Sequence, residues 1–231
     1  MDLWPTKVKC GQAAAEIIAA EIIAADIIVA DIVKLLRTSY QGKVREQMNH
    51  AKPNAARDLV VFLFLIAFGV VGRFVWLDVP NFSPLAATAL FAGFYFRHLP
   101  RAMLVPISVL VISNYWLPLY NSTGEMVAVY AAMLFPVVLS LVLHGKLSLL
   151  RLGVCSVLPS AMFFVVSNFA VWACNNWYAH TWAGLVQCYT SAIPFYRYML
   201  AGDLIFTWGL FGLYVAGSCL VALRRCSPSA L

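Results

Sequence analysis

Long apolar runs separated by short polar or basic segments make up most of the chain after residue 58. A helix needs about 20 apolar residues to cross a bilayer, and it satisfies its own backbone hydrogen bonds there. The pattern therefore predicts an all-α fold, a polytopic transmembrane helix bundle with six spans. The predicted spans are 59–77, 84–96, 102–120, 126–143, 152–173 and 199–223.

The second predicted span is short and rich in small residues. Ser83 followed by Pro84 has the chemistry of an N-cap and a first helical residue, so a helix is expected to begin there. Ala86, Ala89 and Gly93 recur on one face of this helix. Small residues let helix backbones approach closely in a membrane, and these three are predicted helix-packing residues.

The segment 181–198 does not fit the pattern of a simple span. It is weakly apolar, and Pro194 and Arg197 interrupt it. We expect an outer half-helix or lid that leads into the last span. A full crossing here would move the C-terminus, with Arg224 and Arg225, to the outer side of the membrane.

The distribution of basic residues predicts the orientation. Lys and Arg occur before the first span, in every second loop and after the sixth span, whereas the loops 78–83, 121–125 and 174–180 contain neither. Short cytoplasmic loops collect positive residues. Both termini of this multi-pass protein are therefore predicted on the cytoplasmic side of the membrane. The net charge of +6 is read as a topology signal, and no nucleic-acid partner is expected.

Residues 1–47 do not resemble the remainder of the chain. From Ala15 a period of five residues repeats four times, as AEIIA, AEIIA, ADIIV and ADIVK. Four units make only about one coil of a β-helix, and as a helix they place the acids on no common face. We interpret 1–47 as a low-complexity extension, with Met48 as an alternative start, and 48–231 as the membrane domain.

The amino-acid composition supports a lipid environment, and the motifs present limit the kinds of chemistry that we expect of the protein. The chain is 62% hydrophobic and 11% charged, with a mean hydropathy of +0.82, against roughly 45–50% apolar residues in soluble domains. The lipid bilayer is the first expected partner. Motifs for hydrolysis, nucleotide binding and metal ligation are missing, and the six cysteines form no CxxC pair. We expect no enzymatic activity, no cofactor and no metal.

Polar residues within the later apolar runs form the candidate site. Asp203 follows Gly202 near the start of the last span, where a charge must be neutralised, paired or turned towards a water-filled cavity. Arg73 and Arg197 are its expected cationic partners. A polar cavity roofed by aromatic rings is the prediction. The predicted substrate-binding residues are Asn114, Trp116, Asn168, Trp172, Gln187, Tyr189 and Asp203.

Each of these residues also has a purely structural interpretation. Asp203 alternatively caps the last helix, and Asn114 and Asn168 alternatively form hydrogen bonds that only hold helices together. The aromatic residues alternatively belong to the usual interfacial belt. Asp78 and Glu125 are expected at the outer rim in contact with solvent.

Three segments resemble an uncharacterised family of small bacterial six-helix integral-membrane proteins. They are NFSPLAATALFAGFYFR at 81–97, SNFAVW at 167–172 and AGLVQCYTSAIPFYRYMLAGDLIF at 183–206. The resemblance covers about residues 57–223. The plan is similar to the substrate-binding S-components of energy-coupling-factor vitamin transporters. In those proteins small residues on early helices dock a transmembrane coupling subunit, which implies such a role for Ala89 and Gly93.

The leading hypothesis is a substrate-binding component for uptake of a small vitamin-like solute. It would bind a small-molecule ligand from outside and rely on a transmembrane coupling subunit and an ATPase in separate chains. The alternative is a structural or assembly membrane protein of the cell envelope. The polar and aromatic residues predicted at the outer ends of the third, fifth and sixth spans favour the first hypothesis.

Overall fold

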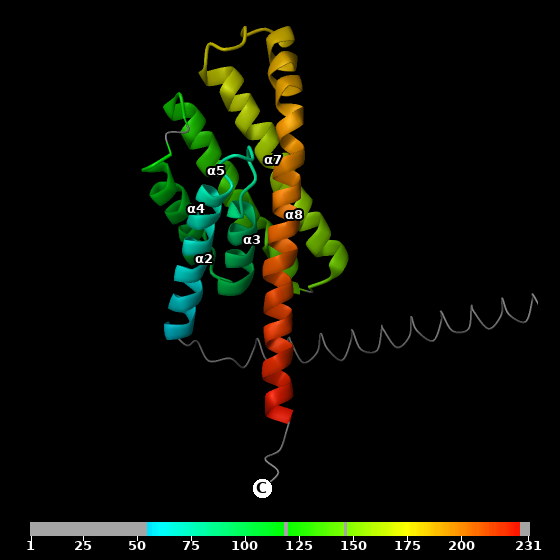
Figure 1. Cartoon of the computed structure of the whole chain (residues 1–231). Coiled ribbons are helices and arrows are strands. Elements are labelled where there is room, and N and C mark those ends of the chain that lie inside the picture. Colours follow the sequence, from blue (N-terminus) through cyan, green and yellow to red (C-terminus); the bar gives the residue numbers. More distant parts are fainter. Residues whose placement is uncertain (1–54, 118–119, 146, 227–231) are drawn as a thin grey trace, which may run out of the picture. The chain divides into compact units, whose positions relative to one another are not determined.

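The computed structural model describes residues 55–117, 120–145 and 147–226, and these residues are helical with short connections (Figure 1). The predicted extension 1–47 and the start at Met48 lie outside the described residues. Within this part of the chain the structure has no strand, so the all-α prediction is confirmed. The helices are α2 (Ala55–Val75), α3 (Leu85–Phe96), α4 (Leu99–Asn114), α5 (Thr123–Leu139), α6 (Leu141–Gly145), α7 (Leu149–Cys174) and α8 (Trp182–Cys226).

The short helix α3 forms the centre of the bundle. It contacts α2, α4, α5 and α8, and every residue from Leu85 to Phe94 is buried. No charged residue interrupts α3, so it can be surrounded on all sides by other helices. The helix begins one residue later than predicted, with Pro84 at the N-cap position and no side-chain cap on its first N–H groups.

Small residues bring α3 and α5 together. A Cβ atom on Gly93 would lie 2.7 Å from the backbone oxygen of Val137 and would overlap the hydroxyl of Ser140. Ala86 and Ala89, on the same predicted face, are also buried. The helix-packing role predicted for these small residues therefore concerns contacts between helices of this chain. Because the chain itself covers these residues, they are not on the surface for a coupling subunit to dock on.

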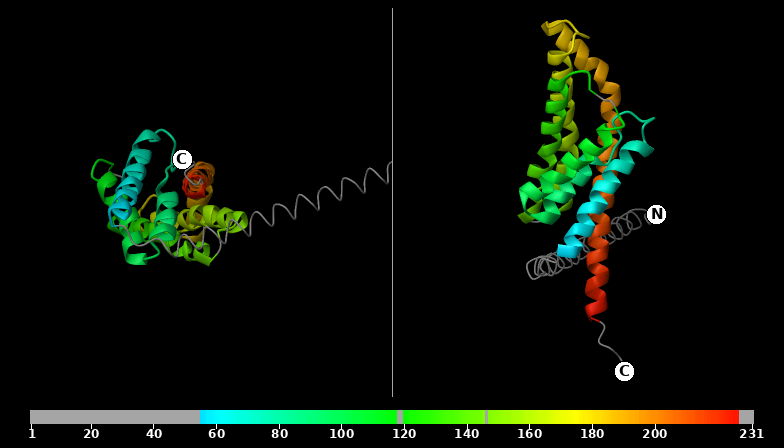
Figure 2. Two further views of the ribbon diagram at one scale, coloured as in Figure 1. Left: turned by 90° about the horizontal axis from the view of Figure 1, so that it is seen from below. Right: turned by 90° about the vertical axis from the view of Figure 1, so that its left-hand side faces the viewer.

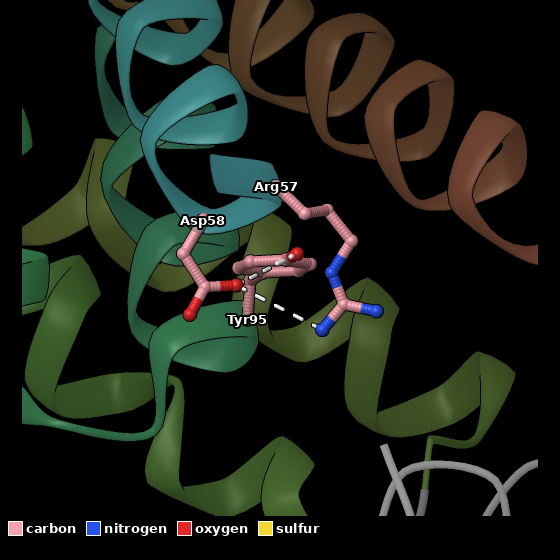
Figure 3. A network of polar contacts seen from close by, with 3 residues as sticks. All are labelled: Arg57, Asp58 and Tyr95. Atoms are coloured by element: carbon pink, nitrogen blue, oxygen red, sulfur yellow. Dashed lines mark hydrogen bonds and ion pairs between the residues drawn. The ribbon is translucent and has the colours of Figure 1, made fainter. Parts of the chain in front are cut away.

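Polar contacts among Arg57, Asp58 and Tyr95 join the start of α2 to the end of α3. The hydroxyl of Tyr95 donates a hydrogen bond to Oδ1 of Asp58 at 3.3 Å, and Arg57 lies 3.8 Å from the same oxygen (Figure 3). The guanidinium of Arg57 also lies over the Tyr95 ring, 6.0 Å from its centroid. Arg97, in the left-handed conformation with φ 53°, ends α3 and lets the chain turn directly into α4.

The last helix differs from the sequence prediction. Residues 181–198 form neither a lid nor a separate half-helix, because α8 runs without interruption for 45 residues through Pro194 (Figure 1). At 1.5 Å per residue this helix is about 67 Å long, more than twice the hydrocarbon thickness of a bilayer. Ala192, Phe195, Tyr196 and Met199 recur at helical spacing on one side of it. This common face explains why the helix continues through the proline.

Figure 2 shows that the C-terminal part of α8 extends past the ends of the other described helices. The buried residues of α8 lie in its N-terminal part and its middle, from Gly184 to Phe211, and they include Cys188, Met199 and Phe206. Towards its end the apolar side chains face outwards, with Leu213 71% exposed. The bundle therefore packs against α8 from its N-terminal part to its middle, and residues 212–221 have no buried side chain.

Four described helical segments are long and apolar enough to cross a membrane, and α3 and α4 are shorter apolar helices. At 12 residues α3 is about 18 Å long, less than the roughly 30 Å of a bilayer core. Large apolar side chains such as Val60 and Leu63 face outwards, as expected in lipid. Six spans and cytoplasmic termini stay predictions. The four long segments are Ala55–Val75, Thr123–His144, Leu149–Cys174 and Trp182–Val221.

The close approach at Gly93 leads to a stability prediction. We expect Gly93→Ala to destabilise the protein by about 1–3 kcal/mol, because the new methyl group meets the α5 backbone and the helices must separate. The control is Gly212→Ala on α8, where a Cβ atom meets nothing within 4 Å. Thermal unfolding in detergent measures both. Equal stability of the two variants would contradict the packing role of Gly93.

Candidate functional site

A cavity of about 470 Å³ lies where α2 ends, α3 begins and α5 begins. Its charged lining residues come from three helices, with Arg73 on α2, Glu125 on α5 and Asp203 on α8. Two potential carboxylates thus face the same space as one guanidinium. Aromatic side chains form much of its wall, so the predicted combination of polar groups and rings is present. The aromatic lining residues are Trp76, Phe82, Phe163, Phe164, Phe195, Tyr120 and Tyr196.

Asp203 is 4% exposed and is fixed by a hydrogen bond from another helix. The hydroxyl of Ser160 on α7 donates to Oδ2 of Asp203 at 2.7 Å. Among the described residues, every fully buried side-chain nitrogen or oxygen atom has a hydrogen-bond partner. Oδ1 of Asp203 has no such partner, so this atom is not itself fully buried. Oδ1 is therefore reachable from the cavity. One carboxyl oxygen holds the side chain in place and the other is free to accept a hydrogen bond.

The predicted cationic partners of Asp203 are wrong. Arg73 donates to Ser113 and Asn114, and Arg197 donates to the hydroxyl of Tyr198 at 2.8 Å while lying over its ring. Neither arginine forms an ion pair with Asp203. The capping interpretation is wrong as well, because α8 begins at Trp182 and Asp203 lies far inside the helix. Ser160 was missed because a single serine in an apolar span is common and gives no signal of its own.

Arg73 is held by polar groups of α4 and the following loop. Its Nη1 atom donates to the hydroxyl of Ser113 at 2.6 Å and to Oδ1 of Asn114 at 3.2 Å. The Asn114 amide in turn donates to the hydroxyl of Tyr130 at 3.2 Å. Tyr120, in the loop after α4, lines the cavity together with Arg73. Asn114 thus lies behind Arg73 and orients it.

Glu125 is buried, and the prediction that it is solvated at the rim is wrong. Its Oε2 atom accepts hydrogen bonds from the amide of Asn175 at 3.1 Å and from the backbone N–H of Asn121 at 3.3 Å. The hydroxyl of Ser122 accepts from the backbone N–H of Glu125. A serine three residues before a glutamate is the sequence signature of a capping box, and the bond from Glu125 N–H to Ser122 is one half of that motif. The bonds of the Glu125 carboxylate to Asn121 and Asn175 lie outside the motif.

Asn168 lies in the cavity lining beside Ser167. Its amide donates to the carbonyl of Phe164 one turn earlier at 2.8 Å, so its own Oδ1 remains available to the cavity. Of the predicted substrate-binding residues, the structure places Asn168 and Asp203 together in this lining. Asn114 contributes through Arg73.

The other four predicted residues do not line the cavity. Trp116 is 62% exposed and packs against Phe74, and Trp172 donates its indole N–H to a loop carbonyl at Ala179. Gln187 is exposed on α8. Tyr189 donates to the carbonyl of Val165 at 2.7 Å and borders a separate groove. Within the described ranges, no three His, Cys, Asp or Glu side chains are grouped to hold a metal ion.

The apolar helical bundle defines the chain as an integral membrane protein. It belongs to a family of unknown function, DUF6580, whose sequence model matches residues 53–221. This match contains all three segments that carry the resemblance to an uncharacterised membrane family, and it confirms that resemblance. No curated protein and no solved structure matches the chain significantly. The similarity to S-components of vitamin transporters is not shown by these comparisons.

The bond between Ser160 and Asp203 leads to a second prediction. Ser160→Ala leaves a buried carboxyl oxygen without its donor, and we expect a loss of about 1.5–3 kcal/mol in stability. Ser156→Ala is the matched control, since Ser156 is equally buried one turn earlier but bonds only to the carbonyl of Leu152 on its own helix. Chemical unfolding in detergent measures both. A double-mutant cycle with Asp203→Ala, which removes both acceptor oxygens, gives the coupling energy, and a value of zero would refute the interaction.

Proposed function

We propose that the protein is the substrate-binding component of an uptake system for a small vitamin-like solute, with the solute held in the cavity. The observation that carries this proposal is Asp203, a buried acid whose Oδ1 atom forms no hydrogen bond within the described residues and faces the cavity. A protein that needed the acid only for packing would satisfy both oxygens internally.

The size and lining of the cavity support a small-molecule ligand. Ligand sites generally occupy roughly 300–1,000 Å³, and most have apolar and aromatic walls with a few converging polar groups. The cavity, at about 470 Å³, lies in this range. Its aromatic wall can stack on a flat ring, while the acids and Asn168 fix the orientation of the ligand.

The charges define the chemistry of the solute. Asp203 presents a hydrogen-bond acceptor, and Asn168 presents another through its Oδ1 atom. Glu125 adds a second carboxylate to the lining. A solute with N–H or O–H donors, or with one positive charge, complements this arrangement best.

Orientation follows from the charge pattern. The segment from Trp76 to Ser83 and the start of α5 border the cavity, and the loops 78–83 and 121–125 contain neither Lys nor Arg. Short loops without basic residues favour the outer side of the membrane. We therefore place the cavity on the outer side of an inner membrane, with six crossings and cytoplasmic termini. The energy would come from a transmembrane coupling subunit and an ATPase in other chains, because this sequence holds no nucleotide-binding motif.

Analysis of bound small molecules tests the proposal. We expect mass spectrometry of the gently purified protein to detect one solute, and Asp203→Asn to weaken its binding by about 1.5–3 kcal/mol, or roughly tenfold to a hundredfold. The amide is nearly isosteric, so the variant should remain folded. A ligand-free protein in stable complex with cell-envelope machinery would instead support the structural or assembly role. Binding that does not change in Asp203→Asn would remove this residue from the site.

Cysteine labelling tests the orientation. In a background without native cysteines, a membrane-impermeant maleimide added from outside should label Thr123→Cys but not Leu149→Cys. Both positions are exposed and lie at opposite ends of the α5–α7 hairpin. Labelling of Leu149→Cys from the outside in intact cells would reverse the proposed topology.

A further inference from the structure

The cavity brings together a positive and a negative side chain that different helices hold in place. Arg73 at the end of α2 donates hydrogen bonds to Ser113 and Asn114 of α4. Asp203 of α8 accepts a hydrogen bond from Ser160 of α7. Arg73 and Asp203 line the same space of about 470 Å³, and within the described residues they form no ion pair with each other. The cavity therefore has a cationic side on α2 and an anionic side on α8.

The backbones that carry these two charges approach the same short segment of the chain. Each charged residue follows a glycine that packs against this segment. A Cβ atom on Gly72 would overlap the ring of Pro84. A Cβ atom on Gly202 would lie 3.4 Å from the backbone nitrogen of Ser83. Because Ser83 and Pro84 are consecutive and lead into α3, a single small molecule beside them can contact both charged groups.

Arg73 keeps hydrogen-bond donors for a ligand. A guanidinium has five N–H donors, and both hydrogen bonds from Arg73 to α4 come from Nη1. Tyr120 beside Arg73 offers one phenol oxygen, which cannot accept all three N–H donors on Nε and Nη2. Arg73 thus resembles Asp203, whose Oδ1 atom has no hydrogen-bond partner among the described residues. Each charged group can form further hydrogen bonds in the cavity.

The charges of the lining restrict what can bind there. A solute with only a positive charge would lie beside the guanidinium of Arg73, and one with only a negative charge would lie beside the acids Asp203 and Glu125. Like charges repel each other strongly in a space with largely apolar walls, because little water screens them. A molecule that carries both charges avoids either repulsion. A carboxylate also matches the fork of N–H donors on a guanidinium, and an ammonium group matches a carboxyl oxygen.

We propose that the solute is a small zwitterion, with a primary or secondary ammonium group held by Asp203 and a carboxylate held by Arg73. This inference rests on the proposed solute-binding function and specifies its ligand class. Aromatic residues of the wall, such as Phe163 and Phe164, cover the apolar part of the solute between its two charged ends.

Chemical derivatisation of the co-purified solute tests this proposal with the full-length protein. Small molecules released from the purified wild-type protein are treated with dansyl chloride, which modifies primary and secondary amines, or with a carbodiimide and aniline, which convert carboxylates to anilides. Mass spectrometry detects the products. We expect one solute that is modified by both treatments. A solute that is modified by only one of them, or by neither, would overturn the zwitterion and leave the solute-binding function intact.

A substitution of Arg73 tests the cationic side of the cavity. Arg73→Gln removes the charge but keeps a side chain that can donate to Ser113 and Asn114. We expect this variant to retain about a tenth or less of the solute that the wild type retains per mole of protein, because the charge-assisted hydrogen bonds to the carboxylate are lost. Mass spectrometry of the released solute measures this loss.

The matched control is Arg197→Gln. Arg197 lies on α8, donates to the hydroxyl of Tyr198 and does not line the cavity. This variant should retain as much solute as the wild type, and thermal unfolding in detergent checks that both variants are folded. Equal retention of the solute in Arg73→Gln and Arg197→Gln would overturn the role of Arg73 and with it the inference.

The outcomes separate this inference from the proposed function. A wild-type protein that carries no small molecule refutes the proposed function, whereas a solute with a single kind of charge refutes only the zwitterion. The derivatisation uses no variant, so it decides between these outcomes even if Arg73→Gln does not fold.

Discussion

The structure depends on the close packing of α3 inside a ring of longer helices. In lipid the hydrophobic effect does not drive helices together, so association relies on packing of small residues and on hydrogen bonds between helices. Gly93 allows the backbone of α5 to approach, and Gly72 on α2 similarly leaves room for Pro84. At the other end of α3, the imidazole Nε2 atom of His144 lies 2.9 Å from the carbonyl of Gly93. A larger residue at either glycine would push the neighbouring helix away and weaken these contacts.

The shortness of α3 explains the position of the cavity. The helix has only 12 residues, and its first residues, Leu85 and Ala86, line the cavity floor. Beyond this point the centre of the bundle has no helix to fill it, and the surrounding α5, α7 and α8 enclose an open space. The uncapped N-terminal end of α3 contributes partial positive charge here, which stabilises carboxylates nearby. The shortness of α3 therefore leaves room for the cavity at its N-terminal end.

Sequence reasoning succeeded where a residue conflicted with its surroundings. Asp203 and Asn168 line the cavity, and both stood out in the sequence because polar groups in apolar runs are costly. The helix α3 was predicted from Ser83-Pro84 and from its small residues. Sequence reasoning failed where the role of a residue depended on its neighbours in the folded structure. Ser160 and Glu125 gain their roles from helices 43 and 50 positions away in the chain. Pro194 was read as a break because a proline removes one hydrogen bond, but the face that α8 presents to the cavity continues on both sides of it. Aromatic residues were the least informative, since membrane interfaces and ligand sites use the same side chains.

The charged side chains that line the cavity have different hydrogen-bond partners from those in a structural ion pair. Arg73 and Asp203 both line the cavity, but they form no ion pair with each other. Instead each is held by neutral groups, Arg73 by Ser113 and Asn114 and Asp203 by Ser160. Neutral partners fix the geometry of a charge without cancelling it, so each group keeps unused hydrogen-bonding capacity. An ion pair would have used those hydrogen-bonding sites within the protein. The separation of these two charges by neutral partners is therefore the arrangement expected of a binding site, in which an incoming polar group completes the hydrogen bonds.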